Sequence, residues 1–478
     1  MVYRVTCRRW PARVFLSILT LLILVAVAAG AAVTPSASAA TVARGLCEPY
    51  LPRMEEVDQE ALLRELKEDL RASYVRFMVS WRQAEPKEGE FDSTYMAGVA
   101  SAVDLAESYD LKIIITFHDV PKWASQKNLW PTPDGYRGNF AMSLASLPAF
   151  ESFCEYFSAQ FRGRVFGYEC WNEPNQALFI RPQSRPGDPS FAVKRYIKML
   201  ERFSKGITAG DPHPTDPKRA HALRIAGATG PNGNTGVTSS FPIRFAQAIK
   251  GAKGATSWFD AYSHHPYSPS ASAKPWPEAP PRDPSRTVNL QNLKRLLNVF
   301  PKKPFYLTEY GYTTVSCNLF GQSFSQATQA EYLRRAYVYA KRFPQVKMLM
   351  WYLLTDQAAG RAGVYTGLRE ANGAKKPAWF TFAQGSRLTV TGPNRIRKGK
   401  PFTLEGKVTW RAQGVKVSLV LQDRVRDGKW IERKTVKAAT VKPDGSYTVQ
   451  LRAGESKYYR LVWPGVVTGK AHFVKVTR

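Results

Sequence analysis

The sequence predicts a (β/α)8 barrel followed by a smaller all-β sandwich. Between residues 41 and 384, short apolar runs alternate with amphipathic helical stretches. From residue 385 to 478 the helical periodicity disappears and strand-like alternation replaces it. The 478 residues are also enough for one large and one small domain.

The first forty residues, 1–40, are predicted to be a signal peptide rather than part of the fold. Four arginines precede the uncharged apolar run Val14–Val33, and the small residues Ala37-Ser38-Ala39-Ala40 offer a cleavage site. We therefore expect a protein that is secreted or associated with the cell envelope, with no membrane contact after cleavage. The apolar run is also long enough to be retained as an N-terminal anchor, which is the alternative.

The barrel is predicted from continuous apolar strands that alternate with helices, which is typical of a parallel sheet covered on both faces. The expected strands are Thr41–Leu46 (weakly marked), Tyr74–Val79, Leu111–Phe117, Val165–Trp171, Leu223–Ala228, Trp258–Ser263, Phe305–Thr308 and Val346–Leu353. The expected helices are Glu60–Ala72, Tyr95–Ser108, Leu147–Phe161, Phe191–Ala209, Leu290–Val299 and Gln326–Lys341. Eight such units fit a closed barrel better than an open sheet. No G-x-G-x-x-G follows the first strand, which argues against a nucleotide-binding protein.

The sandwich, residues 385–478, is predicted from two-residue alternation in Val415–Leu421 and Tyr447–Leu451. Turn signals such as Asp427-Gly428 and Pro443-Asp444-Gly445 separate the runs. We expect an antiparallel, immunoglobulin-like domain.

Charge is concentrated in this C-terminal segment. The whole chain has a net charge of +30, and residues 385–478 contain 21 Lys/Arg against 6 Asp/Glu. Nucleic acid is the first partner such a charge suggests, but no nucleic-acid motif is present. For an exported monomer, anionic cell-wall or extracellular polymer is the expected partner, and solubility alone is the simpler alternative.

Of the five cysteines, Cys7 lies in the signal peptide, and the remaining four permit disulfides in an exported chain. Their spacings match no zinc motif, so no metal is expected. Cys47 and Cys317 are the preferred pair, because both are expected to follow strands at the same open face of the barrel. Four buried thiols are the alternative.

Two glutamates follow buried strands, where a charge is costly unless it is used or paired. One run ends in Trp171-Asn172-Glu173-Pro174-Asn175 and another in Thr308-Glu309-Tyr310-Gly311. In a (β/α)8 barrel both would lie at the C-terminal ends of strands, where the active site is built. Retaining hydrolysis of a glycoside needs two carboxyl groups about 5–5.5 Å apart. The two motifs therefore predict a glycosidase.

At these motifs the sequence resembles the glycoside hydrolases of clan A, in particular family 39 and the family 5 cellulases. The resemblance covers residues 41–384. It implies that Glu173 is the acid/base, that Glu309 is the nucleophile and that Asn172 binds the sugar 2-hydroxyl. Four weaker matches imply supporting roles: Arg76 beneath the nucleophile, Tyr267 of His265-Pro266-Tyr267 hydrogen-bonded to it, Trp351 stacked under the reacting sugar, and His118 on the substrate side.

The expected activity is hydrolysis of O-glycosidic bonds in a poly- or oligosaccharide, by double displacement and without metal or organic cofactor. A transglycosylase of the same fold is one alternative. A non-catalytic carbohydrate-binding protein of the envelope is another, against which the presence of both glutamates argues.

Overall fold

The computed structural model describes residues 42–478, except for 128–137, 213–220, 235, 269–275, 319–321, 361, 410–417, 425–429, 433–438, 443 and 465. The predicted signal peptide lies outside the described residues and stays a prediction. Among the residues that are described, no helix is both long and apolar enough to cross a membrane.

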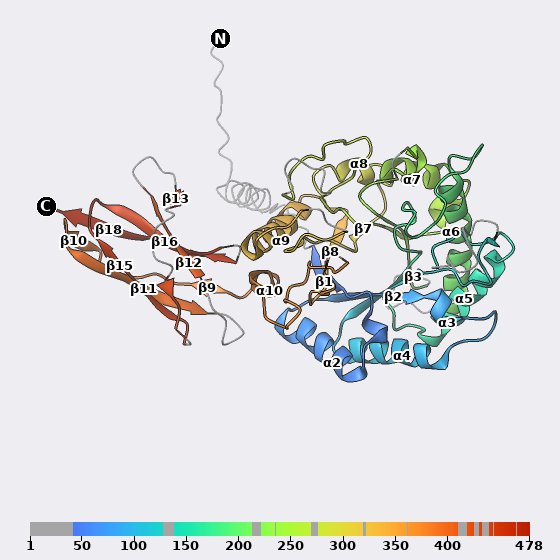
Figure 1. Cartoon of the computed structure of the whole chain (residues 1–478), viewed down its shortest axis with the longest axis horizontal. Coiled ribbons are helices and arrows are strands. Elements are labelled where there is room, and N and C mark those ends of the chain that lie inside the picture. Colours follow the sequence, from blue (N-terminus) through green and yellow to red (C-terminus); the bar gives the residue numbers. More distant parts are fainter. Residues whose placement is uncertain are drawn as a thin grey trace, which may run out of the picture. The chain divides into compact units, whose positions relative to one another are not determined.

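Eight parallel strands close into a barrel, in which β8 pairs with β1 (Figure 1). They are β1 (Ala43–Cys47), β2 (Tyr74–Ser80), β3 (Lys112–His118), β4 (Gly167–Glu169), β5 (Leu223–Thr229), β6 (Ala261–His264), β7 (Phe305–Leu307) and β8 (Val346–Tyr352). The predicted barrel is confirmed, including its weakly marked first strand. Both strands that precede the glutamate motifs end earlier than expected, so Cys170, Trp171 and Thr308 lie beyond the sheet.

Helices surround the barrel in Figure 1. They are α2 (Glu56–Arg64), which continues as a π-helical turn (Glu65–Asp69), α3 (Trp81–Ala84), α4 (Ser93–Ser108), α5 (Leu147–Gln160), α6 (Phe191–Gly210), α7 (Pro242–Gly251), α8 (Lys294–Leu297), α9 (Gln326–Ala340) and α10 (Pro377–Ala383). Short 3-10 turns lie at Leu51–Arg53, Thr238–Ser240 and Ala255–Ser257. All six predicted helices are present with shifted ends, whereas α3, α7 and α10 were not predicted. Helices α7 and α10 begin with a proline in the first turn, where its missing N–H costs nothing.

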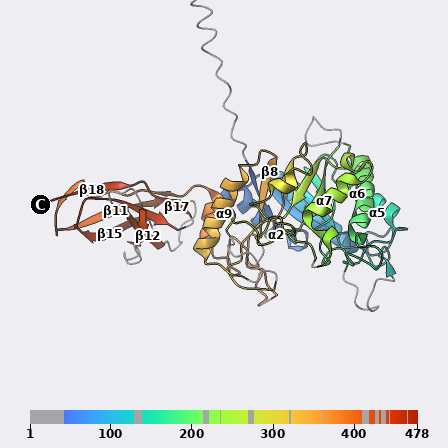
Figure 2. The same cartoon turned by 90° about the horizontal axis from the view of Figure 1, so that it is seen from above.

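Helices α5 and α6 lie side by side outside the barrel in both views (Figures 1 and 2). Two glycines of α6 make this close approach possible. A Cβ atom on Gly206 would lie 2.4 Å from the carbonyl oxygen of Glu151, and one on Gly210 would lie 2.2 Å from that of Glu155. Both carbonyls belong to the backbone of α5 and cannot rotate away, so any larger residue at either glycine would push the two helices apart.

Side chains of the barrel strands alternate between two apolar layers, as the two-residue period of a strand requires. One small cluster gathers Ile114, Leu223, Ile225, Ala261, Tyr306, Met348 and Met350. The larger cluster takes the intervening strand residues, such as Val75, Phe77 and Trp351, together with the helices. The parity of a strand position therefore decides whether its side chain can reach the barrel mouth.

The C-terminal region consists of two sheets, which confirms the predicted all-β part. One has the order β10-β18-β16-β12-β13, with β14 on β12 and β17 on β16, and the other has the order β15-β11-β9. The strands are β9 (Arg387–Leu388), β10 (Arg395–Arg397), β11 (Pro401–Thr409), β12 (Ser418–Arg424), β13 (Trp430–Glu432), β14 (Ala439–Thr440), β15 (Ser446–Arg452), β16 (Lys457–Trp463), β17 (Val467–Thr468) and β18 (His472–Thr477). The pairing is antiparallel except between β10 and β18, which run parallel. The immunoglobulin-like assignment stays a prediction.

The preferred disulfide between Cys47 and Cys317 is wrong in this structure, because all four described cysteines are buried free thiols. Cys47 is the last residue of β1 and does not lie on the open face. Its sulfur accepts a hydrogen bond from Arg76 Nη1 at 3.1 Å, inside the barrel. Cys47 therefore occupies a strand-end position and not the loop position that the disulfide requires.

Candidate active site

A cavity of about 340 Å³ brings the two glutamates together at the barrel mouth. It is lined by Pro49, Tyr50, Met78, His118, Asn172, Glu173, Leu178, Phe179, Pro231, Asn232, Tyr267, Ser268, Glu309 and Tyr352. Five residues predicted from the sequence are among them: His118, Asn172, Glu173, Tyr267 and Glu309.

The backbone that presents Glu173 is held in an unusual conformation. Trp171 and Glu173 have φ values of 72° and 35°, in the region that non-glycine residues rarely adopt. Two contacts to the β5 end hold this turn: the Glu173 N–H donates to Ala228 O at 2.9 Å, and Asn175 Oδ1 accepts from the Gly230 N–H at 2.8 Å. Together they keep the Glu173 carboxyl directed into the mouth.

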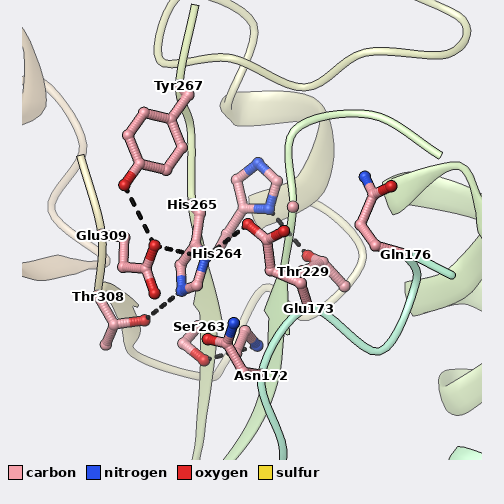
Figure 3. Close-up of polar contacts among 12 residues, drawn as sticks. Asn172, Glu173, Gln176, Thr229, Ser263, His264, His265, Tyr267, Thr308 and Glu309 are labelled. Atoms are coloured by element: carbon pink, nitrogen blue, oxygen red, sulfur yellow. Dashed lines mark hydrogen bonds and ion pairs between the residues drawn. The ribbon is translucent and has the colours of Figure 1, made fainter. Parts of the chain in front are cut away.

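Glu309 is held by hydrogen-bond donors on both oxygens. Its Oε1 accepts from Arg76 Nη1 at 2.8 Å. Its Oε2 accepts from the Tyr267 hydroxyl at 3.1 Å, as Figure 3 shows. Both contacts agree with the supporting roles predicted for Arg76 and Tyr267. An acceptor that receives two donors, one of them a guanidinium, is suited to remain an ionised carboxylate.

Glu173 lies in a different environment. Its Oε1 is 2.9 Å from His265 Nδ1, and 17% of its side chain is exposed to the cavity. Burial raises the pKa of Glu173 to about 7, although the positive charge of Arg76 acts in the opposite direction. Two neighbouring carboxyl groups thus have different environments, which is the pattern that separates a proton donor from an anion.

One carboxylate oxygen of Glu173 and one of Glu309 lie within 4.8 Å of each other, and His265 offers a ring nitrogen within the same distance of both. Two carboxylates and an imidazole are ordinary metal ligands. Here, however, the oxygens of Glu309 already accept from Arg76 and Tyr267, and the guanidinium would repel a cation. The donor set therefore does not fit a metal site.

A third carboxylate, Glu169 at the end of β4, lies fully buried beneath the pair and was missed in the sequence. Its Oε2 accepts from Arg76 Nε at 2.8 Å and from the Thr116 hydroxyl at 2.6 Å. Arg76 Nη2 also donates to Asn172 Oδ1 at 2.8 Å. Arg76 therefore joins Glu169, Glu309 and Asn172 in one buried network. A charged residue within an apolar strand run was the signal for it.

The stacking role predicted for Trp351 is not supported, because Trp351 lies away from the cavity. It is 1% exposed, packs in the outer apolar layer and donates its indole N–H to Thr366 O at 2.7 Å. The next residue on β8, Tyr352, lines the cavity instead. In the β1–β8 register Tyr352 pairs with Cys47, which bonds Arg76, whereas Trp351 pairs with the outward-facing Leu46.

The two adjacent histidines have separate surroundings. His265 contacts Glu173, as described above, and is fully buried. His264 is also buried, with its ring nitrogens 2.8 Å from the Thr229 hydroxyl and 2.9 Å from Val288 O. His118 lines the cavity, and its Nδ1 lies 3.2 Å from Asp119 Oδ1. His118 therefore lines the cavity and His265 contacts Glu173, whereas the ring nitrogens of His264 face Thr229 and Val288.

The closed barrel and its paired mouth carboxylates define a glycoside hydrolase of clan A. The family model for Cellulase (glycosyl hydrolase family 5) matches residues 39–353, and the chain belongs to this family. Of the two families named as resemblances, family 5 is therefore the one shown. No curated protein matches the chain significantly.

One solved structure with a TM-score above 0.5 shares the fold at low identity. A GH5_18 enzyme from Streptomyces cattleya, solved with GlcNAc, is 14% identical, with a TM-score of 0.52 over 76% of this chain and 86% of that one. The exo-β-1,4-mannosidase Op5Man5 from Opitutaceae bacterium strain TAV5 is 17% identical, with a TM-score of 0.49 over 72% of this chain. The chain covers only 58% of the length of that mannosidase.

Proposed function

We propose that the protein is a retaining glycosidase that cleaves O-glycosidic bonds of a poly- or oligosaccharide by double displacement. One observation carries the proposal: one carboxylate oxygen of Glu173 lies within 4.8 Å of one of Glu309. Retaining enzymes place their carboxyl groups about 5–5.5 Å apart, whereas inverting enzymes leave about 6.5–9.5 Å for a water molecule. A non-catalytic sugar-binding protein would not need two such groups.

The different environments of Glu173 and Glu309 assign their catalytic roles. Glu309, held by Arg76 and Tyr267, attacks the anomeric carbon and forms a glycosyl ester. Glu173 donates its proton to the leaving oxygen and, as a carboxylate, then takes a proton from the water that cleaves the ester. If a sugar hydroxyl replaced that water, the same residues would catalyse transglycosylation.

The test is the stereochemistry of the first product. Purified protein, screened with EDTA present on a panel of polysaccharides and aryl glycosides, should release sugar, and NMR at early times should show the substrate's own anomeric configuration. An inverted first product would refute double displacement. No turnover on any substrate would favour the binding protein, and transfer to added sugar acceptors in preference to water would favour the transglycosylase.

We further propose that the protein is exported and that its C-terminal sheets bind anionic polymer. The N-terminal arginines and apolar run support export. Polymer binding is supported by exposed cations on neighbouring strands, since Arg395 of β10 lies directly beside Lys475 of β18. Like charges in this position repel each other unless an anion lies between them. Arg397 is exposed on the same edge strand.

Replacing Arg395, Arg397 and Lys475 by glutamine in the full-length protein should weaken its retention on anionic cell-wall polymer. Retention of the unchanged protein should also fall with salt, because the screening length drops from about 8 Å at physiological strength to about 3 Å at 1 M. The matched control replaces three exposed lysines of the barrel region, Lys294, Lys302 and Lys341. Equal loss in both triple variants would show that only net charge matters. Hydrolysis of small soluble substrates should stay unchanged.

A further inference from the structure

A chain of hydrogen bonds connects Glu173 to the buried Glu169. Glu173 Oε1 lies 2.9 Å from His265 Nδ1, and His265 Nε2 lies 3.1 Å from the Thr308 hydroxyl (Figure 3). That hydroxyl lies 2.9 Å from Glu169 Oε1. In each of these hydrogen bonds the proton could belong to either partner. Which partner donates along the chain therefore depends on which of the two glutamates is ionised.

The charge lies at the Glu169 end. Glu169 forms a salt bridge of 2.6 Å with Arg76 Nη2 and also accepts from the Thr116 hydroxyl. Burial alone would raise the pKa of Glu169, but Arg76, His265 and the hydrogen bonds outweigh it and hold that pKa below its usual value. An ionised carboxylate only accepts hydrogen bonds.

Because Glu169 is ionised, the positions of the protons on Thr308 and His265 are determined. The Thr308 hydroxyl has one proton, which it donates to Glu169, so it accepts from His265 Nε2–H. Burial lowers the pKa of His265 to about 4, so the ring is neutral near pH 7 and carries a single N–H. His265 Nδ1 therefore presents a lone pair, 2.9 Å from Glu173 Oε1 and 3.6 Å from Glu309 Oε2.

We propose that Glu169, Thr308 and His265 are positioning residues that keep the proton on Glu173, because they hold the imidazole in its Nε2–H tautomer. A lone pair that faces two carboxyl groups requires one of them to donate. Glu309 already receives Arg76 and Tyr267, so Glu173 is the donor. The inference rests on the proposed function and deepens it, since it names the residues that set the protonation state of the acid/base Glu173.

The same lone pair acts in both half-reactions. In the first, Glu173 gives its proton to the leaving oxygen, and its hydrogen bond to Nδ1 is lost. The resulting carboxylate then faces an acceptor, which makes it a stronger base toward the water that it deprotonates in the second half-reaction. The proton that water supplies restores the original state, so the cycle balances without any further donor.

Replacing Thr308 by valine should move the basic limb of the pH profile of kcat/KM to lower pH. Without the hydroxyl, the ring is free to carry its proton on Nδ1 and to stabilise ionised Glu173. The shift should be about one unit, the size of one hydrogen bond to a charged group. Other charges that face Glu173 (Arg76 from β2 and Glu309 after β7) are unchanged, as are His118 and Tyr267 in the cavity.

Two variants serve as controls. Thr308→Ser retains the hydroxyl and should restore the limb. Thr116→Val removes a different hydroxyl from Glu169 without touching His265, and should leave the limb in place even if the rate falls. A limb that is unmoved in Thr308→Val, or moved equally in Thr116→Val, would overturn the inference while leaving the glycosidase intact. An inactive wild-type protein would instead contradict the proposed function.

A second measurement does not depend on activity or on any variant that fails to fold. The chain has only six histidines, so nitrogen-15 NMR of labelled imidazoles is practical. At pH 7, His265 should show a protonated Nε2 and an unprotonated Nδ1. The opposite tautomer, or a doubly protonated ring, would overturn the inference.

Discussion

Replacing Glu309 by glycine is expected to lower kcat by roughly 10⁵-fold, because loss of a nucleophile removes the covalent route altogether. External azide should restore part of the turnover. The vacated space lies between Arg76 Nη1 and the Tyr267 hydroxyl, which both remain as donors for a small anion. Azide attacks the anomeric carbon from the position of the lost carboxylate, so the glycosyl azide should have inverted configuration.

Glu309→Gln is the matched control for this rescue. Its amide fills the same space and cannot attack, so the variant should be equally inactive and azide should not help. The melting temperature of each variant, compared with the unchanged protein, separates lost chemistry from lost folding. Wild-type rates in either variant would show that Glu309 is not the nucleophile.

The barrel and the C-terminal sheets could be predicted because their side-chain periods differ so clearly along the chain. Short helices without a strong period could not be predicted: α3 is only four residues long, α10 seven and α7 ten. The predicted ends of β4 and β7 are too late because Trp171 and Thr308, which follow the apolar runs, are residue types that are common in strands. What ends β4 is backbone geometry, a positive φ at Trp171, which composition does not reveal.

Site residues could be predicted where a sequence motif identified them. They could not be predicted where the strand register decides which side chain faces the cavity. Glu173, Glu309, Arg76, Asn172 and Tyr267 converge on one network in the structure, as the two motifs and their supporting matches implied. Trp351 and Tyr352 differ by a single position, and only the strand register decides which of them faces the mouth.

Contacts between distant strands could not be predicted where no motif implied them. Cys47 was expected at an open face, yet its thiol bonds Arg76, because β1 ends one residue later than expected. Glu169, Thr308 and His265 come from three separate parts of the chain, and their hydrogen bonds exist only after the barrel closes. Such a network has no local sequence pattern.

Replacing Glu173 by glutamine is the other change with a large expected effect. For substrates with a poor leaving group, kcat/KM should fall by about 10²–10⁴-fold, the usual contribution of a general acid. An aryl glycoside with a very acidic phenol needs no protonation, so its first half-reaction should survive. A burst of phenol should then be followed by slow turnover, because no base remains to activate water.

The pH profile gives the assignment its sharpest test. Because Glu173 must be protonated to act as the acid and burial raises its pKa to about 7, kcat/KM of the unchanged protein should fall as pH rises through that value. Glu48 is a matched control, since burial also raises its pKa to about 7 and its contact is the Leu354 N–H. Glu48→Gln should retain the basic limb, whereas Glu173→Gln should lose it.

Replacing Glu173 by glutamine should lower activity without lowering stability. The folded protein holds a proton on Glu173 between the unfolded-state value of about 4.3 and the folded value, so this carboxyl destabilises the fold as pH rises through that window. At pH 8, Glu173→Gln should therefore melt at the same temperature as the unchanged protein or higher, and at pH 4 the difference should vanish. A lower melting temperature at pH 8 would mean that the glutamate stabilises the fold, and that its environment is not the one that makes an acid.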